Sequence, residues 1–304
     1  MTLTPESTEA EPTGTPIPNE PAGVDTPELG RTRFRLPLVG YLTLVPAALL
    51  VIIAVIGPWI VPYSATEVVA KPDLPPGTDG HWFGTDSAGM DVFSRTIAAT
   101  QNNLVIGVLT TLAATGVGVL LGLLVGMNES RSGPIGWVSR GVSRSLDLIQ
   151  AIPAIIIGLV LIAFFGATIP SLVFALSVIL MPNQARLVRT EVLRVRGEAY
   201  LDAARISGES ETAVILRHVL PNSSWPALEN ASLVFGSAII LTAGLGFLGV
   251  GLNPPTPEWG SMIAAGAPAA AVGRWWPAMF PAIALAITVF AVTAVGQRFF
   301  NDER

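Results

Sequence analysis

Cysteine is absent from this chain, lysine occurs once, at position 71, and histidine twice, at positions 81 and 218. Without cysteine, disulfides, thiol catalysis and cysteine metal sites are excluded. The two histidines lie far apart in the sequence, which argues against a His-rich metal site. The single lysine lacks the glycines of a phosphate-cradling loop, so a nucleotide-hydrolysing P-loop is ruled out. We therefore expect no cofactor in this chain.

Charge is also scarce, because only 13% of the 304 residues are charged, against about 25% in a soluble domain. The hydrophobic fraction is 51% and the mean hydropathy is +0.59. This composition predicts an integral membrane protein. The His-Glu-x-x-His and Gly-x-Ser-x-Gly motifs are missing, so an intramembrane enzyme would lack its metal set or nucleophile. We expect a protein that is not an enzyme.

The net charge of −5 belongs to one end of the chain. Residues 1–30 hold six acidic side chains and no Lys or Arg, whereas the rest carries 17 basic and 16 acidic side chains. The first segment is also rich in Pro, Thr and Glu and poor in large apolar residues, so it cannot bury enough surface to fold. We predict a disordered acidic cytosolic tail over residues 1–34.

Six apolar segments are long enough, or nearly so, to cross a hydrocarbon core that needs about 20 helical residues. They lie at about 38–61, 104–127, 146–165, 169–181, 227–250 and 278–295. The sequence therefore predicts an all-α membrane protein with six transmembrane helices. The expected divisions are a first helix over 35–62, an extracytoplasmic loop over 63–103 and a core over 104–300, with a loop at 186–222. A short interfacial helix is expected at 91–99.

Basic residues indicate the sidedness of these spans. With a cytosolic N-terminus, the inside segments contain 14 Arg residues, whereas the outside loops contain only Lys71, Arg95 and Arg274. An even number of spans returns the C-terminus to the same side. We therefore expect a multi-pass protein of the bacterial plasma membrane with both termini in the cytosol.

Two sets of residues inside the spans have more than one interpretation. Gly118, Gly122 and Gly126 form a small-residue stripe that suits close helix packing, with gating as the alternative. Acidic and amide side chains near span ends are candidates for lining a solute path, or they have interfacial roles; they are Asp147, Gln150, Glu229 and Asn230.

The most informative segment is a polar loop on the cytosolic side. Residues 197–207 permit a helix, and Gly208 stands where a helix C-terminal glycine adopts positive φ. Ser210 can cap a second helix, and Leu220-Pro221 is expected to stop it. The loop thus predicts a rigid two-helix knob, either a surface feature or a docking site for a soluble partner.

The spacing of this loop resembles the cytosolic Glu-Ala-Ala…Gly…Ile-x-Leu-Pro motif of ABC-importer permeases. Asp202 replaces the usual Glu and His218 the usual Ile. Two further signatures, at 81–95 and at 246–260, resemble the C-type permease of dipeptide, oligopeptide and nickel importers, with Met90 and Trp82 in place of the usual Arg and Pro. The resemblance covers about residues 80–300.

The resemblance implies a type I importer permease that works with a second permease, ATPase subunits that bind ATP and Mg, and an extracytoplasmic solute-binding protein. It assigns coupling to the ATPase to the following positions: Asp202, Ala203, Ala204, Arg205, Gly208, Leu220 and Pro221. Peptides are the implied solute, with nickel or a glutathione-like molecule as alternatives. An ion-coupled secondary transporter is the remaining rival, and it would require more ionisable groups near mid-span.

Overall fold

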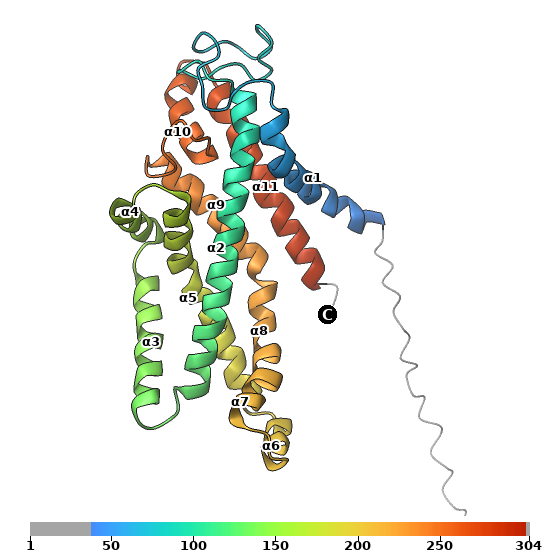
Figure 1. Cartoon of the computed structure of the whole chain (residues 1–304), viewed down its shortest axis with the longest axis vertical. Helices are drawn as coiled ribbons and strands as arrows, with labels where there is room; N and C mark the ends of the chain where they lie inside the picture. The colour runs from blue at the N-terminus through green and yellow to red at the C-terminus, as the bar shows by residue number, and fades with distance from the viewer. Residues whose placement is uncertain (1–37, 302–304) are drawn as a thin grey trace, which may run out of the picture. The chain divides into compact units, whose positions relative to one another are not determined.

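The computed structural model describes residues 38–301, and these form a helical bundle (Figure 1). The predicted tail lies outside the described residues. Residues 38–301 contain no β-strand, only two isolated bridges. The elements are α1 Leu38–Ile60, α2 Val92–Asn128, α3 Pro134–Ala151, α4 Ala154–Phe165, α5 Ile169–Val195, α6 Ala199–Ile206, α7 Glu211–Val214, the π-helical turn η1 Ile215–Val219, α8 Leu220–Glu229, α9 Ala231–Phe247, α10 Trp259–Ala270 and α11 Trp276–Asn301.

The helices account for the six predicted spans in three ways. Helices α2, α5 and α11 are each long and apolar enough to cross a membrane. Two bent pairs, α3 with α4 and the α7–α8 stretch with α9, raise the number to five within the described residues. The described apolar part of α1, Leu44–Ile60, is shorter than these spans. The predicted all-α membrane fold is confirmed.

The third predicted span, 146–165, is wrong as a single straight helix. The chain turns by 99° between α3 and α4. Ile152 between them is extended, with φ −91° and ψ 134°, and Pro153 follows it. A proline clashes with a helical conformation of the preceding residue, which explains the break at this position.

The segments that were expected to lie outside the cell are more helical than predicted. The expected loop over 63–103 ends early, because α2 begins at Val92 and absorbs the short helix predicted at 91–99. Asp91 caps this start by accepting the Ser94 N–H at 2.7 Å. The segment between the predicted spans 227–250 and 278–295 contains α10. Hydropathy marked only the most apolar part of each element, so it missed the helical turns outside that part.

Helices α2 and α5 pack together along the glycine stripe. A Cβ atom at Gly122 would lie 2.5 Å from the Ala185 carbonyl oxygen, and one at Gly118 would lie 2.5 Å from Gln184 Cβ. One at Gly126 would lie 2.7 Å from Val192. Only glycine permits this approach, so the interpretation of the stripe as close packing is confirmed.

Candidate functional site

The polar loop forms a compact knob beyond the ends of α5 and α8 (Figure 1). Helix α6 ends in a Schellman motif, in which Gly208 N–H donates to Arg205 O at 3.0 Å and Glu209 N–H donates to Ala204 O at 3.1 Å. Gly208 has φ +88°, and the Ser210 hydroxyl accepts the Ala213 N–H at 3.3 Å. The predicted glycine turn and serine cap are both confirmed.

Arg205 holds the two arms of the knob together. Its guanidinium donates to Glu211 at the start of α7 and to Asp202 one turn earlier in α6, each at 2.9 Å. The hydrogen bond that Arg205 donates to Glu211 is the largest cause that raises the pKa of Arg205. His218 and Glu209 approach to 3.3 Å on the other side of the elbow. The knob is therefore braced internally.

Leu201 anchors the knob in the helical bundle, and we call this buried contact the root of the knob. Its side chain is completely buried, in one cluster with Met127 of α2, Val192 of α5 and Val219 of η1. Ala204 packs against the same cluster. Asp202, Ala203 and Gly208 are exposed, and Ile206 at the tip is 87% exposed. The signature residues thus divide into an inner set that anchors the knob and an outer set that a partner can contact.

The prediction that Leu220-Pro221 stops a helix is wrong. Helix α7 runs through η1 into α8, and Pro221 lies in the first turn of α8. Proline lacks an N–H, and a π-helical turn before it shifts the hydrogen-bond pattern so that the missing donor is tolerated. The Asn222 side chain donates to the carbonyl of His218 at 2.6 Å. The knob is consequently continuous with α8.

A mostly apolar hollow of about 760 Å³ lies at the α3–α4 elbow. The elbow supplies residues 149–154 and Ile157, α5 supplies two residues and α9 three. Gln150 and Ser237 are its polar side chains, and no ionisable side chain lines it. Gln150 was a candidate from the sequence, but the other lining residues were not, because mostly apolar residues spread over several helices form no motif. These other residues are Ile149, Ala151, Ile152, Pro153, Ala154, Ile157, Ile179, Leu180, Ser237, Ile240 and Leu241.

The four candidate path residues do not meet at one place. Arg186 of α5 donates to Asp147 and to Gln150, which brings these two together beside the hollow. Glu229 and Asn230 line a different hollow of about 310 Å³ with residues of α5, α9 and α11. Asn230 also donates to Gln184 Oε1 at 3.1 Å, within a buried polar cluster.

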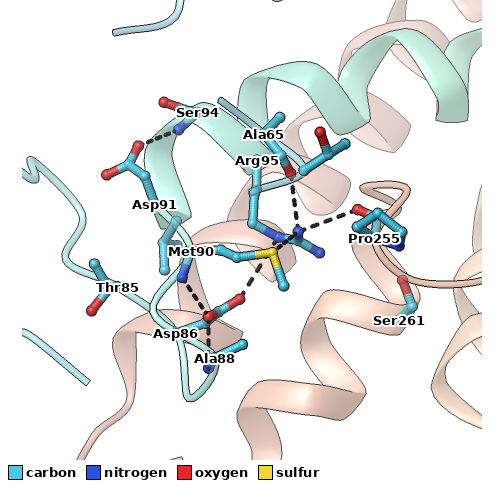
Figure 2. A network of polar contacts seen from close by, with 12 residues as sticks. Ala65, Thr85, Asp86, Ala88, Met90, Asp91, Ser94, Arg95, Pro255 and Ser261 are labelled. Atoms are coloured by element: carbon cyan, nitrogen blue, oxygen red, sulfur yellow. Dashed lines mark hydrogen bonds and ion pairs between the residues drawn. The ribbon is translucent and has the colours of Figure 1, made fainter. Parts of the chain in front are cut away.

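On the opposite side of the bundle, the two other signatures form one structure, which we call the cap (residues 61–95 and 253–259). Arg95 is its centre, as Figure 2 shows. Arg95 Nη1 donates to the carbonyl oxygens of Ala65, at 3.0 Å, and Pro255, at 3.3 Å. It also contacts the Met90 sulfur and lies 3.7 Å from Asp86. Sequence reasoning found both signatures but not their contact.

Further hydrogen bonds attach segment 253–259 to the start of α2. Asn102 donates to the Pro257 carbonyl at 2.8 Å, and Trp259 Nε1 donates to the Thr96 carbonyl at 3.1 Å. A buried pair, His81 with Asp91 at 2.8 Å, closes the other part of the cap. These contacts make the cap a rigid surface.

Glu258 joins the cap to two helix ends. It is completely buried, and its oxygens accept the N–H groups of Gly260, at 2.6 Å, and Ser261, at 2.8 Å, at the start of α10. Burial raises the pKa of the Glu258 carboxyl, while the two backbone donors act in the opposite direction. Gly246 and Gly251 leave the space that the carboxylate occupies, since Cβ atoms there would lie 2.1 and 3.1 Å from it.

A helical membrane bundle with a rooted knob at one end, a rigid cap at the other and an apolar hollow between helices has the architecture of a membrane transport subunit. Residues 118–301 match the family model of the binding-protein-dependent transport system inner membrane component. The chain belongs to this family and is a transmembrane permease subunit of an ABC importer, not an enzyme. It is an inner-membrane protein of a type whose partners are other permease, ATPase and substrate-binding subunits.

Related permeases cover most of the chain. It is 33% identical over 254 residues to the probable D,D-dipeptide transport system permease DdpC of Escherichia coli K12, covering 84% of this chain and 81% of the relative. It is 32% identical to the di/tripeptide permease DppC of Pseudomonas aeruginosa, covering 82% of each. It is 35% identical to the glutathione permease GsiD of Escherichia coli O6:K15:H31, covering 87% of this chain and 86% of the relative.

A solved structure supports the fold. A chain of the MetNI methionine ABC transporter, in an inward-facing conformation, matches 70% of this chain and 97% of its own length, with a TM-score of 0.56 and 20% identity. This likeness bears on the fold alone and confirms the type I permease architecture.

Proposed function

We propose that this permease carries di- or oligopeptides into the cell and that its knob is the coupling helix that receives the motion of an ATPase subunit. The peptide class is supported by the relatives, two of which are named for dipeptide or di/tripeptide transport. The coupling role is supported by the spacing of the knob motif and by its local construction.

One observation carries the coupling proposal. Leu201 is fully buried among residues of α2, α5 and η1, so a displacement of the knob is transmitted to those helices. Close-packed interiors resist compression, and a packed root therefore acts as a rigid joint. Asp202, Ala203, Arg205 and Gly208 form the ATPase-facing part, while Ala204, Leu220 and Pro221 belong to the root and to α8.

The test uses the complete importer in proteoliposomes with its solute-binding protein. Ala203→Arg adds a bulky cation on the exposed side of α6 without disturbing the root. We expect it to reduce peptide-stimulated ATP hydrolysis and uptake by at least tenfold while membrane insertion is unchanged. Ser145→Arg, on exposed α3, is the matched control. Normal coupling in Ala203→Arg would contradict the lever role of the knob.

Two observations concern the alternatives. Glutathione is the second candidate solute, because the chain is 35% identical to permeases named for it, and competition uptake with glutathione separates the two. Nickel as a transported solute is supported by the sequence resemblance alone. Among the residues searched, no group of three or more His, Cys, Asp or Glu could hold a metal ion. Uptake that persists without ATP but with an ion gradient would favour a secondary transporter.

The proposed orientation places both termini, the part of α3 up to Ser145 and the knob in the cytosol and the cap outside. Its support is the 14 to 3 distribution of basic residues. The natural chain has no cysteine, so single cysteines at Ser87 in the cap and Ser145 in α3 report the two sides directly. A membrane-impermeant maleimide added to whole cells is expected to label the first and not the second.

A further inference from the structure

Arg186 and Asp147 form a charged pair beside the apolar hollow at the α3–α4 elbow. Its Nη2 atom donates to Asp147 Oδ1 at 3.1 Å and also to Gln150 Oε1. Gln150 is itself a lining residue of the hollow. The guanidinium therefore lies one hydrogen bond from the lining, whereas the lining itself carries no charge.

The guanidinium of Arg186 retains donors for a further partner. Both of its contacts use Nη2, and within the described part of the chain Nε and Nη1 have no hydrogen-bond partner. The side chains of Arg186 and Asp147 are 54% and 60% exposed. An arginine of this kind offers a planar fork that matches the two oxygens of a carboxylate.

The place of Arg186 along α5 fits the cytosolic end of a path. It lies 17 residues after the start of the helix at Ile169, which is about 26 Å at 1.5 Å per residue. The hydrocarbon core is about 30 Å thick. A solute that leaves the hollow toward the cytosol thus meets this cation near the inner membrane boundary.

We propose that Arg186 binds the terminal carboxylate of the transported peptide, taking it in exchange for the carboxylate of Asp147. This assignment rests on the proposed peptide function and adds a specificity-determining residue to it. A free peptide carries an ionised terminal carboxylate at neutral pH, because the α-carboxyl pKa is about 3.5. Asp147 keeps Arg186 paired when no solute is present, and Gln150 holds the guanidinium beside the hollow in both situations.

The experiment compares trialanine with trialanine amide, which lacks the carboxylate, in ATP-driven uptake by the complete importer. The measured quantity is the ratio of the two uptake rates for each permease variant, with the same solute-binding protein. Any preference of that protein is common to all variants and cancels when the ratios are compared. We expect Arg186→Gln to lower the ratio by about five- to tenfold, the size of one partly hydrated charge-assisted hydrogen bond.

Three variants make the result specific. Arg144→Gln removes an exposed arginine of α3 one turn before Asp147 and is expected to leave the ratio unchanged. Arg186→Lys keeps the charge without the fork and is expected to give an intermediate ratio; it also serves if Arg186→Gln fails to assemble. Asp147→Asn leaves Arg186 in place and is expected to keep or raise the ratio.

The outcomes separate this inference from the proposed function. Equal ratios for wild type, Arg186→Gln and Arg186→Lys would overturn the role of Arg186 while peptide transport stands. A fall in Asp147→Asn as large as in Arg186→Gln would overturn it as well, since it would mean that the ion pair serves only to hold α3 on α5. Absence of ATP-dependent uptake of both peptides by the wild type would overturn peptide transport itself, and the inference with it.

Discussion

Arg95 donates a hydrogen bond to the carbonyl oxygen of Pro255, 160 positions later in the chain, at 3.3 Å. The same Nη1 atom reaches the carbonyl of Ala65, so one guanidinium joins three segments of the cap (Figure 2). The side chain is only 7% exposed. The carbonyls of Ala65 and Pro255 both accept their hydrogen bond from this buried guanidinium.

We therefore expect Arg95→Ala to destabilise the protein, because it leaves the carbonyls of Ala65 and Pro255 without this donor and the Asp86 carboxylate without its ion-pair partner. A loss of about 3 kcal/mol corresponds to a fall in apparent melting temperature of roughly 6–12 °C. Thermal unfolding in detergent measures it. Lys71→Ala removes an exposed cation from the same cap and is expected to have no effect. Equal melting temperatures for the two variants would contradict the central role of Arg95.

The contact between α2 and α5 predicts opposite effects for one substitution at two glycines of α2. Gly122→Ala forces its methyl group against the Ala185 carbonyl oxygen and is expected to cost about 1–3 kcal/mol. Gly116 faces open space, so Gly116→Ala is expected to be neutral or to stabilise by about 0.5–1 kcal/mol through reduced chain entropy. Melting temperatures of the two single variants decide the matter, and a tolerated Gly122→Ala would show that the helices separate easily.

The root of the knob predicts a contrast between Leu201 and Ile206, two apolar residues of α6. Leu201→Ala creates a cavity in a fully buried cluster and is expected to cost about 2–5 kcal/mol. Ile206→Ala changes an exposed tip and is expected to leave thermal stability unchanged. Differential scanning fluorimetry of the purified permease compares them. If the two variants have the same melting temperature, the knob is not anchored through Leu201.

The buried carboxyl of Glu258 predicts a pH-dependent contribution to stability. Its pKa in the folded protein is raised by burial, so the folded state holds this proton at pH values where the unfolded chain has lost it. The stabilising contribution of Glu258 is therefore fully present below the unfolded pKa, near about 4.3, and is lost as the pH rises through the folded value.

Glu258→Gln removes this titration. We expect the difference in melting temperature, wild type minus Glu258→Gln, to decrease as the pH is raised from about 4 to 8. Asp79, an exposed acidic residue of the cap, supplies the control variant Asp79→Asn, measured over the same pH range. A difference that increases with pH would mean that the backbone donors of Gly260 and Ser261 outweigh burial.

Local structure was predictable from the sequence where a few neighbouring residues determine the backbone conformation or the packing. Gly208 has the expected positive φ, Ser210 caps α7, and the glycines of α2 meet α5. The apolar runs also located the spans. The turn at Ile152-Pro153 was missed because hydropathy averages across it, although the proline was a signal for a break.

The tertiary relationships were not predictable in this way. Nothing near Arg95 in the sequence indicates Pro255, and nothing near Gln150 indicates Ser237 or Arg186. These contacts depend on how separate helices cross, which a single sequence does not encode as a local pattern. Pro221 shows a different difficulty, because a π-helical turn let the helix continue through a residue that ordinarily ends one.

The buried position of Leu201 has a consequence for biogenesis. The pocket that receives this side chain is built from α2, α5 and η1, so it exists only after residues from 127 to 219 have folded together. The exposed surface of α6 therefore reaches its final form late. An incompletely inserted chain lacks the rooted knob, so under the proposed coupling role we expect an ATPase subunit to assemble only with a finished permease. On this proposal, the contact of Leu201 would serve as a checkpoint on assembly in addition to transmitting motion.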